Sequence, residues 1–416
     1  MNKTITVSCI GVGQRGNIYM TEMLKLGKDK YKIVSLCDLK TERLELAKNN
    51  YGVLGSNLFT DEDEFFKEKR SDLLIVGTND QDHVRLCLKG LKVGYDILCE
   101  KPISDKEDEL KELLKVQQET GHKVVICHVL RYAPAFMTIK EYVDSGVIGQ
   151  VVMIDDIENV GYSHQAHSYV RGNWRTTKEA APMILAKCCH DLDLLVWLAN
   201  SKCESISSLG DLRYFKKENQ PVGASSRCKD CKYRGSCVFD AYELYIKQNF
   251  WGRVAVTDKR PITEEALRES LDNGPYGRCV FECDNDVVDN QITMMRFKNG
   301  ITANLRMTAF TACGGRIMKI YGTYGQIDLD ETRGVIELKP FGKEKTVTQI
   351  SSLIDATNGH GGGDHGIVES LYDFLTKEQS KNISLLDVSI ESHLMGIAAE
   401  KSRIHGGERI VINHDK

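Results

Sequence analysis

One apolar, helix-like stretch, Met183 to Ala199, carries side chains that could do chemistry. Its sequence, MILAKCCHDLDLLVWLA, contains Lys187, His190, Asp191 and Asp193. At helical spacing Lys187, His190 and Asp193 follow one another at intervals of three, so one edge of the helix is polar. Because unpaired buried charge is costly, two interpretations are open: ion pairs with nearby Lys or Arg, or the wall of an active site.

A glycine-rich loop lies between a β-rich run and a helical pattern in TITVSCIGVGQRGNIYM. Gly11, Gly13 and Gly16 have the spacing G-x-G-x-x-G. In dinucleotide-binding folds these glycines form a tight turn, admit the pyrophosphate, and let the helix pack closely on the strand. The helix that starts at Gln14 and Arg15 offers free N–H groups to the phosphates.

A carboxylate, Asp38, ends the second strand-like run, YKIVSLCD, 22 residues after Gly16. This is the place of the acid that binds the ribose hydroxyls and repels a 2′-phosphate. The spacing therefore favours NAD. Lys40 and Arg43 lie nearby and could soften the repulsion, so NADP stays an alternative.

Strand-like and helix-like runs continue to alternate up to about residue 128. The runs are SDLLIVGTNDQDH, VRLCLKGLKVG, YDILCEKPIS, KEDELKELLKVQQETG and HKVVICHVLRY. This alternation predicts βαβ units and a parallel sheet, with a ligand at the carboxyl ends of the strands. A parallel α/β domain that binds another ligand is the alternative.

In the run YDILCEKPIS, Glu100, Lys101 and Pro102 directly follow the strand, at the edge of the sheet where ligands bind. Pro102 fixes its own φ and keeps Lys101 out of the helical region. Taken alone, Lys101 is either a ligand-site residue or an ordinary surface lysine.

The order of these motifs resembles the Gfo/Idh/MocA family of oxidoreductases over essentially the whole chain. The motifs are G-x-G-x-x-G, the ribose Asp, EKP after a strand, and a helix with H-D-x-D. The resemblance implies a Rossmann domain over 1–128 and an α/β domain over 129–416 with a large, mostly antiparallel sheet. It also implies an NAD(P)-dependent dehydrogenase that acts on a hydroxyl of a sugar, glycoside or cyclitol.

The resemblance assigns Lys101 to both the nicotinamide and the reacting hydroxyl, and makes His190 the acid/base opposite. Asp191 or Asp193 could orient the His190 imidazole. The implied cofactor site consists of Gly11, Gly13, Gln14, Arg15, Gly16, Asp38, Thr78, Asn79, His83, Glu100, Lys101, Pro102 and Arg131.

The chain departs from the family pattern at Ala186, where many members carry an Asp four residues before the histidine. We expect the neighbouring Lys187 to approach the substrate instead and count it among the catalytic residues. If the ammonium groups of Lys101 and Lys187 converge, each disfavours the charge of the other, and one becomes a base near physiological pH.

The segment DDIENVGYSHQAHSYVRGNWRTT is rich in groups that bind polyhydroxylated ligands. It supplies paired donors and acceptors and aromatic faces; a loop with incidental histidines is the alternative. With Asp191 of the helix, the predicted substrate-binding residues are Tyr162, His164, His167, Arg171, Trp174 and Arg175.

A cysteine cluster, RCKDCKYRGSC, has the spacing Cys228-x2-Cys231-x5-Cys237. Cys279 or Cys283 could complete a four-thiolate set, and Cys279 is our choice. Structural zinc is the first interpretation and an iron–sulfur cluster the second; reduced cysteines without metal are the alternative. We expect an inserted lobe at about 211–286, acting as a lid or a subunit contact.

The last third contains β-type runs separated by Asn-Gly or Gly-rich turns, which predicts an antiparallel meander. One open face of such a sheet would need a partner, so we expect a homo-oligomer, a dimer or tetramer. NGHGGGDHGIV interrupts the runs with His360, Asp364 and His365, either as a loop over the substrate pocket or as a flexible connection.

The composition bounds the class of protein. With 416 residues two domains are the default. A formal net charge of -4, with 41% hydrophobic and 27% charged residues, argues against nucleic acid or an anionic membrane as the main partner. No apolar run in the sequence is long enough to span a membrane, and 14 cysteines without an export signal indicate reduced thiols. We expect a cytoplasmic protein.

Two other functions are compatible with the motifs. One is an NAD-dependent glycosidase that oxidises a sugar hydroxyl transiently, eliminates the aglycone and returns the hydride. The other is a cofactor-binding regulator without catalysis, against which the EKP lysine and the histidine argue.

Overall fold

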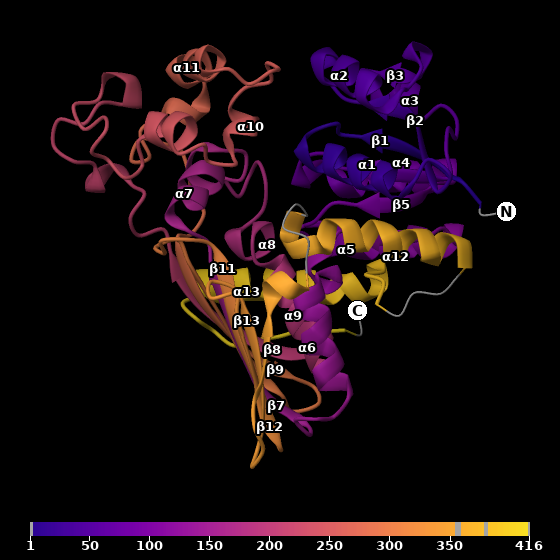
Figure 1. The fold of residues 1–416 in the computed structure, drawn as a ribbon, viewed down its shortest axis with the longest axis vertical. Helices are drawn as coiled ribbons and strands as arrows, with labels where there is room; N and C mark the ends of the chain where they lie inside the picture. The colour runs from indigo at the N-terminus through magenta and orange to yellow at the C-terminus, as the bar shows by residue number, and fades with distance from the viewer. Residues whose placement is uncertain (1–2, 354–358, 378–381, 415–416) are drawn as a thin grey trace.

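The computed structural model describes residues 3–353, 359–377 and 382–414. These residues form two sheets with associated helices, and a helical lobe inserted between two strands of the second sheet (Figure 1). No described helix is both long enough and apolar enough to cross a membrane.

The first sheet has six parallel strands in the order β3-β2-β1-β4-β5-β6. The strands are β1 (Ile5–Ile10), β2 (Tyr31–Cys37), β3 (Leu58–Phe59), β4 (Leu73–Val76), β5 (Asp96–Cys99) and β6 (Val124–Ile126). The helices between them are α1 (Gln14–Leu26), α2 (Thr41–Tyr51), α3 (Glu62–Phe65), α4 (His83–Val93) and α5 (Glu107–Thr120). This strand order is that of a Rossmann fold, so the predicted fold class of the first domain is confirmed.

The second sheet has nine strands in the order β14-β13-β12-β11-β7-β10-β9-β8-β15. They are β7 (Val151–Asn159), β8 (Cys203–Asp211), β9 (Asn290–Phe297), β10 (Thr302–Thr308), β11 (Gly315–Gly322), β12 (Gly325–Asp330), β13 (Val335–Pro340), β14 (Thr346–Gln349) and β15 (Ile410–Val411). Among the described strands of this second sheet, only β7 and β10 pair in parallel. The predicted, mostly antiparallel sheet is confirmed.

Helices cover one face of the second sheet, as Figure 1 shows for α6 and α9. They are α6 (Pro134–Asp144), α8 (Met183–Ala186), α9 (Cys189–Ala199) and α13 (Leu386–Ile404). Strand β9 shows the resulting alternation: Met295 and Phe297 are buried, whereas Ile292 and Met294 are 54% and 61% exposed. One face of the sheet is therefore core, and the other faces outward.

The inserted lobe lies between the end of β8 at Asp211 and the start of β9 at Asn290. It contains η5 (Lys217–Asn219), η6 (Cys228–Asp230), η7 (Glu243–Lys247), α10 (Arg253–Val256), α11 (Glu264–Asn273) and η8 (Pro275–Gly277). Two small apolar clusters hold it together, one around Tyr245 and Leu271 and one around Phe215 and Phe239. In Figure 1 the lobe lies above α7 (Tyr162–His164) at the upper left, at the same height in the view as α2 of the Rossmann domain.

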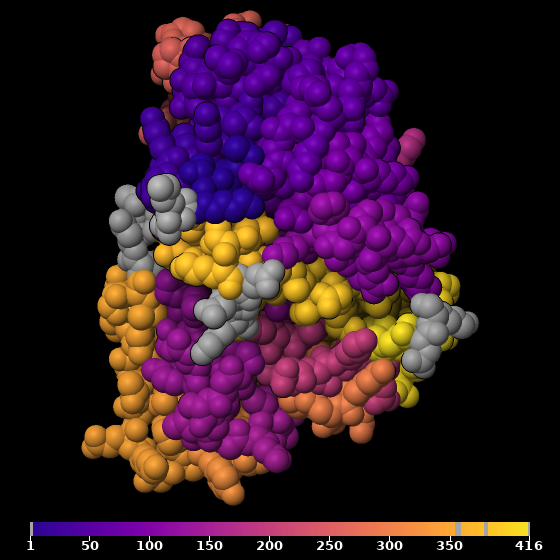
Figure 2. Space-filling view, turned by 90° about the vertical axis from the view of Figure 1, so that its right-hand side faces the viewer, coloured from indigo at the N-terminus to yellow at the C-terminus, as the bar shows by residue number. Residues whose placement is uncertain are grey.

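Two helices from the last part of the chain lie between the sheets. In Figure 2 they form a yellow and orange band beneath the indigo Rossmann domain. Helix α12 (Gly363–Lys377) packs Ile367 and Leu371 into the core around β1 and β2, and the Tyr31 hydroxyl donates to the Val368 carbonyl at 2.9 Å. Helix α13 adds Leu386 to the other face of the same sheet.

Candidate functional site

The glycine loop after β1 forms a cradle that side chains would fill. Gly11 has a positive φ of 85°, and a Cβ there would lie 2.6 Å from the Gly77 carbonyl carbon. A Cβ at Gly16 would lie 2.4 Å from the Gly11 oxygen. At Gly13, directly before α1, only the tip of Arg43 lies within contact distance, at 3.7 Å. The loop therefore leaves the N-terminus of α1, at Gln14 and Arg15, open to a phosphate group.

Asp38 lies at the end of β2, beside this loop. Its carboxylate accepts from the backbone N–H of Val12 at 2.8 Å and from that of Lys40 at 2.9 Å. These bonds fix the carboxylate beside the glycine loop. The cradle and the acid together fit a dinucleotide with a free ribose 2′-hydroxyl.

The inserted lobe contacts the same edge through Asp258. Its carboxylate pairs with the Lys40 ammonium at 2.6 Å and with the Arg43 guanidinium at 3.2 Å. The two basic residues that could have attracted a 2′-phosphate therefore already have a carboxylate partner.

The loops after β4 and β5 are tied together by a buried histidine. His83 has Nδ1 2.7 Å from the Pro102 carbonyl oxygen and Nε2 3.2 Å from that of Thr78. His83 therefore holds these two loops together, and Thr78 and Asn79 lie in the loop at the carboxyl end of β4.

An ion-pair chain joins the glycine loop, the EKP motif and the last third of the sequence. Arg15 donates to Glu100 at 2.6 Å and to Asp364, at the start of α12, at 2.7 Å. Glu100 also accepts from the Tyr19 hydroxyl at 2.5 Å and from the Lys101 backbone N–H at 2.9 Å. Glu100 and Arg15 thus fix the backbone that carries Lys101.

Lys101 extends from the Rossmann domain to the polar helix of the second domain. Its Nζ donates at 2.9 Å to the carbonyl oxygen of Ala186, the last residue of α8 and four residues before His190. The stretch predicted as one helix, Met183–Ala199, is two helices, α8 and α9, and His190 lies in the first turn of α9. The structure therefore brings the EKP lysine and the histidine helix together across the domain boundary.

The two carboxylates of the stretch Met183–Ala199 are internal ion pairs. Arg316 of β11 donates to Asp191 at 2.6 and 3.2 Å, and Arg131 donates to Asp193 at 2.6 Å through two nitrogens. The placing of Asp191 on the substrate and of Arg131 in the cofactor cleft needs correction, because both side chains are buried and committed to these pairs. Neither carboxylate bonds to His190.

Lys187 also has a carboxylate partner. Its Nζ lies 3.0 Å from Oε1 of Glu158 on β7, and Glu158 also pairs with Arg316 at 2.7 Å. A carboxylate therefore compensates the charge of Lys187, and the hypothesis that one of two converging lysines becomes a base stays a prediction. The side chain of Lys187 is 16% exposed and stays next to the site.

His190 is the one polar side chain of this helix with a free nitrogen. It is 5% exposed, and its Nδ1 has no hydrogen-bond partner among the described residues. Burial lowers the pKa of the imidazole well below its usual value, and the ammonium of Lys101 adds to that shift. The ring is therefore neutral at physiological pH and able to accept a proton.

A second imidazole lies beside it. The ring centroids of His190 and His360 are 6.0 Å apart. His360 Nδ1 lies 2.9 Å from the Asp364 carboxylate, which Arg15 holds from the other side. This His–Asp pair comes from the glycine-rich segment, whose first residue quoted above, Asn358, lies outside the described residues.

The segment predicted to bind substrate divides into two groups. His164 lies between the lobe and the site: its ring centroid is 5.0 Å from that of Trp251 in the lobe. Burial, with the ammonium groups of Lys187 and Lys101 adding to it, lowers the pKa of this imidazole well below the usual value. Trp174 Nε1 donates to Asp80, in the loop after β4, at 3.2 Å. Trp174 therefore lies at the edge of the Rossmann domain.

The other residues of that segment contact the lobe. His167 bonds to the Tyr245 hydroxyl at 2.8 Å, Arg175 pairs with Asp284 at 2.9 Å, and Tyr162 packs its ring 6.2 Å from Phe239. The Arg171 guanidinium is buried and bonds to lobe backbone. The structure thus shows Arg171 and His167 bonded to residues of the lobe, and their contact with substrate stays a prediction.

All fourteen cysteines are free thiols. Cys228, Cys231, Cys237 and Cys279 line one cavity within the lobe. No three His, Cys, Asp or Glu of the described residues are placed to hold a metal ion.

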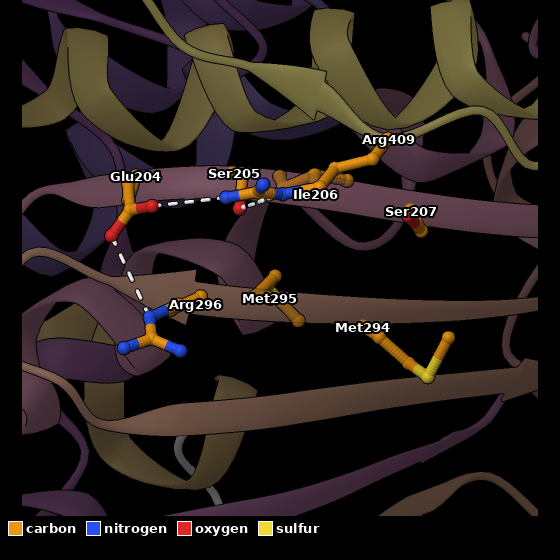
Figure 3. Close-up of a pocket in the computed structure, with 8 residues that line it drawn as sticks. All are labelled: Glu204, Ser205, Ile206, Ser207, Met294, Met295, Arg296 and Arg409. Carbon is orange, nitrogen blue, oxygen red and sulfur yellow. Dashed lines mark hydrogen bonds and ion pairs between the residues drawn. The ribbon is translucent and has the colours of Figure 1, made fainter.

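A shallow groove on the outer face of the second sheet is remote from these groups. Figure 3 shows it between β8 and β9, with Ser205, Met294 and Met295 along it and Arg409 at its rim. It contains none of the predicted catalytic or cofactor residues.

Sequence reasoning missed the residues that hold the site in place. Glu158 and Arg316 come from strands far from the helix that they serve, and no local spacing identifies them. Tyr19 is one helical turn after Arg15, and that spacing could have suggested a shared partner.

Two family models match the chain. One, described as an oxidoreductase family with an NAD-binding Rossmann fold, covers residues 5–128. The other, its C-terminal alpha/beta domain, covers residues 140–402. The chain belongs to this family of oxidoreductases, which bears the name Gfo/Idh/MocA.

The relatives agree with this placement. The chain is 22% identical over 393 residues to the Bacillus subtilis oxidoreductase YteT, a match that covers 89% of this chain and 88% of YteT. It is 25% identical over 213 residues to inositol 2-dehydrogenase of Rubrobacter xylanophilus, covering 49% of this chain and 55% of that enzyme. The chain thus spans about half of the inositol dehydrogenase.

Solved structures show the same fold. The WlbA dehydrogenase of Bordetella pertussis, in complex with NADH and UDP-GlcNAcA, superposes with a TM-score of 0.72 at 16% identity, over 100% of this chain and 99% of that chain. The protein is accordingly an enzyme, an NAD(P)-dependent dehydrogenase that acts on CH–OH groups.

Proposed function

We propose that the enzyme oxidises or reduces a secondary hydroxyl of a sugar, glycoside or cyclitol. The observation that carries this proposal is the contact of Lys101 with the segment that leads to His190. The lysine ammonium donates to the Ala186 carbonyl oxygen, and its charge helps to lower the pKa of the His190 imidazole. The names of two similar proteins support the substrate class. Inositol 2-dehydrogenase acts on a cyclitol, and WlbA is described in complex with a nucleotide sugar.

The residues of the chain provide the binding and proton chemistry. Gly13, the start of α1 and Asp38 would hold the dinucleotide, and nicotinamide, when bound, supplies the hydride donor or acceptor. Lys101 donates a hydrogen bond to the substrate oxygen and stabilises negative charge there. The neutral His190 takes the hydroxyl proton during oxidation and returns it during reduction.

Lys187 and His164 serve the substrate rather than the cofactor. The Glu158 carboxylate orients the Lys187 ammonium at 3.0 Å, and an oriented ammonium donates to hydroxyl or carboxylate oxygens of a ligand. We assign Lys187 to substrate positioning, in place of the family's Asp at the position of Ala186.

NAD is the proposed cofactor. Asp38 repels a 2′-phosphate, and Asp258 neutralises Lys40 and Arg43. Both features disfavour NADP.

The His360–Asp364 pair favours a second candidate, redox-neutral glycoside cleavage. Elimination of an aglycone needs one group to remove a proton from carbon and another to protonate the leaving oxygen. A second imidazole beside His190, held by a carboxylate, could supply that extra group.

One experiment separates these reactions. A panel of sugars, inositols and glycosides is incubated with the enzyme and NAD or NADP, and both NADH absorbance and products are followed. NADH formed from a free sugar or cyclitol supports oxidation, whereas a cleaved glycoside without net NADH supports elimination. Lys101→Met should abolish turnover while NADH still binds; turnover that persists in this variant would refute the proposal.

We also propose that the enzyme is a homo-oligomer whose copies meet on the outer face of the second sheet. Ile292, Met294 and Leu209 are each more than half exposed there, which is unusual for large apolar side chains on one sheet face. Light scattering should give a multiple of the 46.8 kDa chain mass, and Met294→Asp should reduce it to one chain. A wild-type mass of one chain would exclude this assembly.

A further inference from the structure

The inserted lobe presents one indole, that of Trp251, next to the proposed site. Trp251 is 51% exposed, although its ring centroid lies only 5.0 Å from that of His164 and 5.5 Å from that of His167. Aromatic side chains contribute most when their rings are covered, so a half-exposed indole beside polar groups has surface left for a ligand. Sequence reasoning did not select this residue.

The backbone around Trp251 fixes where the indole lies. Asn249 has a positive φ of 52°, and a Cβ at Gly252 would lie 2.7 Å from Nε2 of His167. The Phe250 ring packs with its centroid 4.9 Å from that of the indole. The turn between η7 and α10 therefore needs these residue types, and it gives the indole a defined position.

His164 connects the indole to the groups that would act on the substrate. Burial lowers the pKa of both His164 and His190, and the ammonium of Lys101 lowers both further. Because the effect of a charge decreases with distance, both imidazoles lie around this one lysine. The ring contacts of the indole among the described residues are with His164, His167 and Phe250. The indole is thus a neighbour of His164 and not of the catalytic imidazole.

The segment that follows Trp251 extends to the cofactor edge. Helix α10 comes directly after it, and Figure 1 shows α10 on the side of the lobe that faces the Rossmann domain. Asp258, two residues after α10, pairs with Lys40 at 2.6 Å. One stretch of the lobe therefore spans the region from the cofactor edge to His164.

We propose that the Trp251 indole stacks on a second ring of the substrate, so that the inserted lobe selects a glycoside over the corresponding free sugar. This proposal rests on the proposed function, because it takes the reacting ring to lie at Lys101 and His190. The C–H face of a sugar ring is apolar and weakly positive, and the face of an indole is negative. The stacked ring is the one joined to the reacting ring, because the indole contacts His164 and not His190.

Kinetics on matched pairs of glycoside and free sugar test the proposal. Trp251→Ala should lower kcat/KM for glycosides about tenfold more than for the free sugars, since aromatic stacking contributes on that order. Trp251→Phe keeps an aromatic face and should retain most of the preference. Equal falls for the two substrate classes would place the reacting ring on the indole and overturn the proposal.

Phe341→Ala is the control for these kinetics. This ring is 64% exposed and directly follows β13, outside the lobe, so the wild-type ratio should remain. Circular dichroism checks that each variant is folded. A folded Trp251→Ala enzyme with the wild-type ratio would also overturn the proposal.

Fluorescence follows binding without turnover. The chain has three tryptophans, of which Trp251 is the most exposed and Trp197 is 8% exposed. A glycoside titrated into the complex with NAD should change the emission of the wild type more than that of Trp251→Phe. Equal changes would assign the response to another tryptophan and overturn the stacking. A Trp251-dependent change without turnover of any glycoside would support the stacking and count against the proposed function.

Discussion

His190 stands out among its neighbours because it is the one side chain on the polar edge of its helix without a partner. Asp191 and Asp193 are each held by an arginine, and Lys187 is held by Glu158. The ion-pair interpretation of the Met183–Ala199 stretch is therefore confirmed for Lys187, Asp191 and Asp193, and the active-site interpretation stays a proposal that rests on His190. The carboxylates are structural, and the imidazole is left for chemistry.

Replacing Asp193 by Asn should destabilise the enzyme strongly. The change leaves Arg131 as a buried cation without its partner, which costs about 3 to 5 kcal/mol. Urea unfolding followed by fluorescence measures the loss. Asp373→Asn is the control, since its pair with Lys377 is exposed and should contribute less than about 1 kcal/mol. Equal losses in the two variants would contradict the structural role of Asp193.

Replacing His360 by Gln tests the second imidazole. If His360 exchanges a proton with substrate, kcat should fall by about 10²- to 10⁴-fold with little change in NADH affinity. His365→Gln is the control, because that ring contacts Glu22 at 3.0 Å and not the site. A His360 variant with wild-type kcat on every substrate of the panel would leave His360 with a structural role only.

At the scale of elements, the sequence predicted the features that depend on residues close together in the chain. Alternating apolar strands and helices specified the parallel sheet, and the EKP residues followed from the end of β5. The long-range pairings could not be predicted: β7 pairs with β10 and β11, strands about 150 positions later. For the same reason Glu158 and Arg316 were missed, since their connection to the helix exists only after that sheet has formed.

The contact between lobe and Rossmann domain makes a prediction about the cofactor. Asp258→Ala frees Lys40 and Arg43, so kcat/KM with NADP should rise several-fold relative to that with NAD. Glu269→Ala is the matched control, because this lobe carboxylate pairs with exposed Lys259 instead. An unchanged NADP-to-NAD ratio in Asp258→Ala would show that the contact has no part in cofactor choice.

At the scale of the whole molecule, buried histidines make stability depend on pH. Burial lowers the pKa of both His167 and His393 to about 3. Between that value and the unfolded pKa of about 6.5, the unfolded chain binds protons that the native chain does not. The contribution of these neutral histidines to the free energy of unfolding is therefore fully present above about pH 6.5, and it is lost as the pH is lowered through this window.

The free energy of unfolding should decrease by about 1 kcal/mol per pH unit for each of these histidines. His393→Gln, measured by urea unfolding between pH 4 and 7 (about the window above), should flatten the slope. His405→Gln, at an exposed position, should leave the slope as it is. A His393 variant with the wild-type slope would exclude this histidine as a source of the acid sensitivity.

The position of α12 bears on how this protein is made. The core around β1 and β2 includes Ile367 and Leu371. The Ile126 N–H of β6 donates to the Ser384 carbonyl at 2.8 Å, and the Ser384 hydroxyl donates to the Ile126 carbonyl at 2.6 Å. The ribosome synthesises Ile367 and Leu371 hundreds of codons later than the strands β1 and β2, against which they pack. During synthesis the nucleotide-binding domain therefore has an incomplete hydrophobic core. Its exposed apolar surface is accessible to chaperones until synthesis is nearly finished.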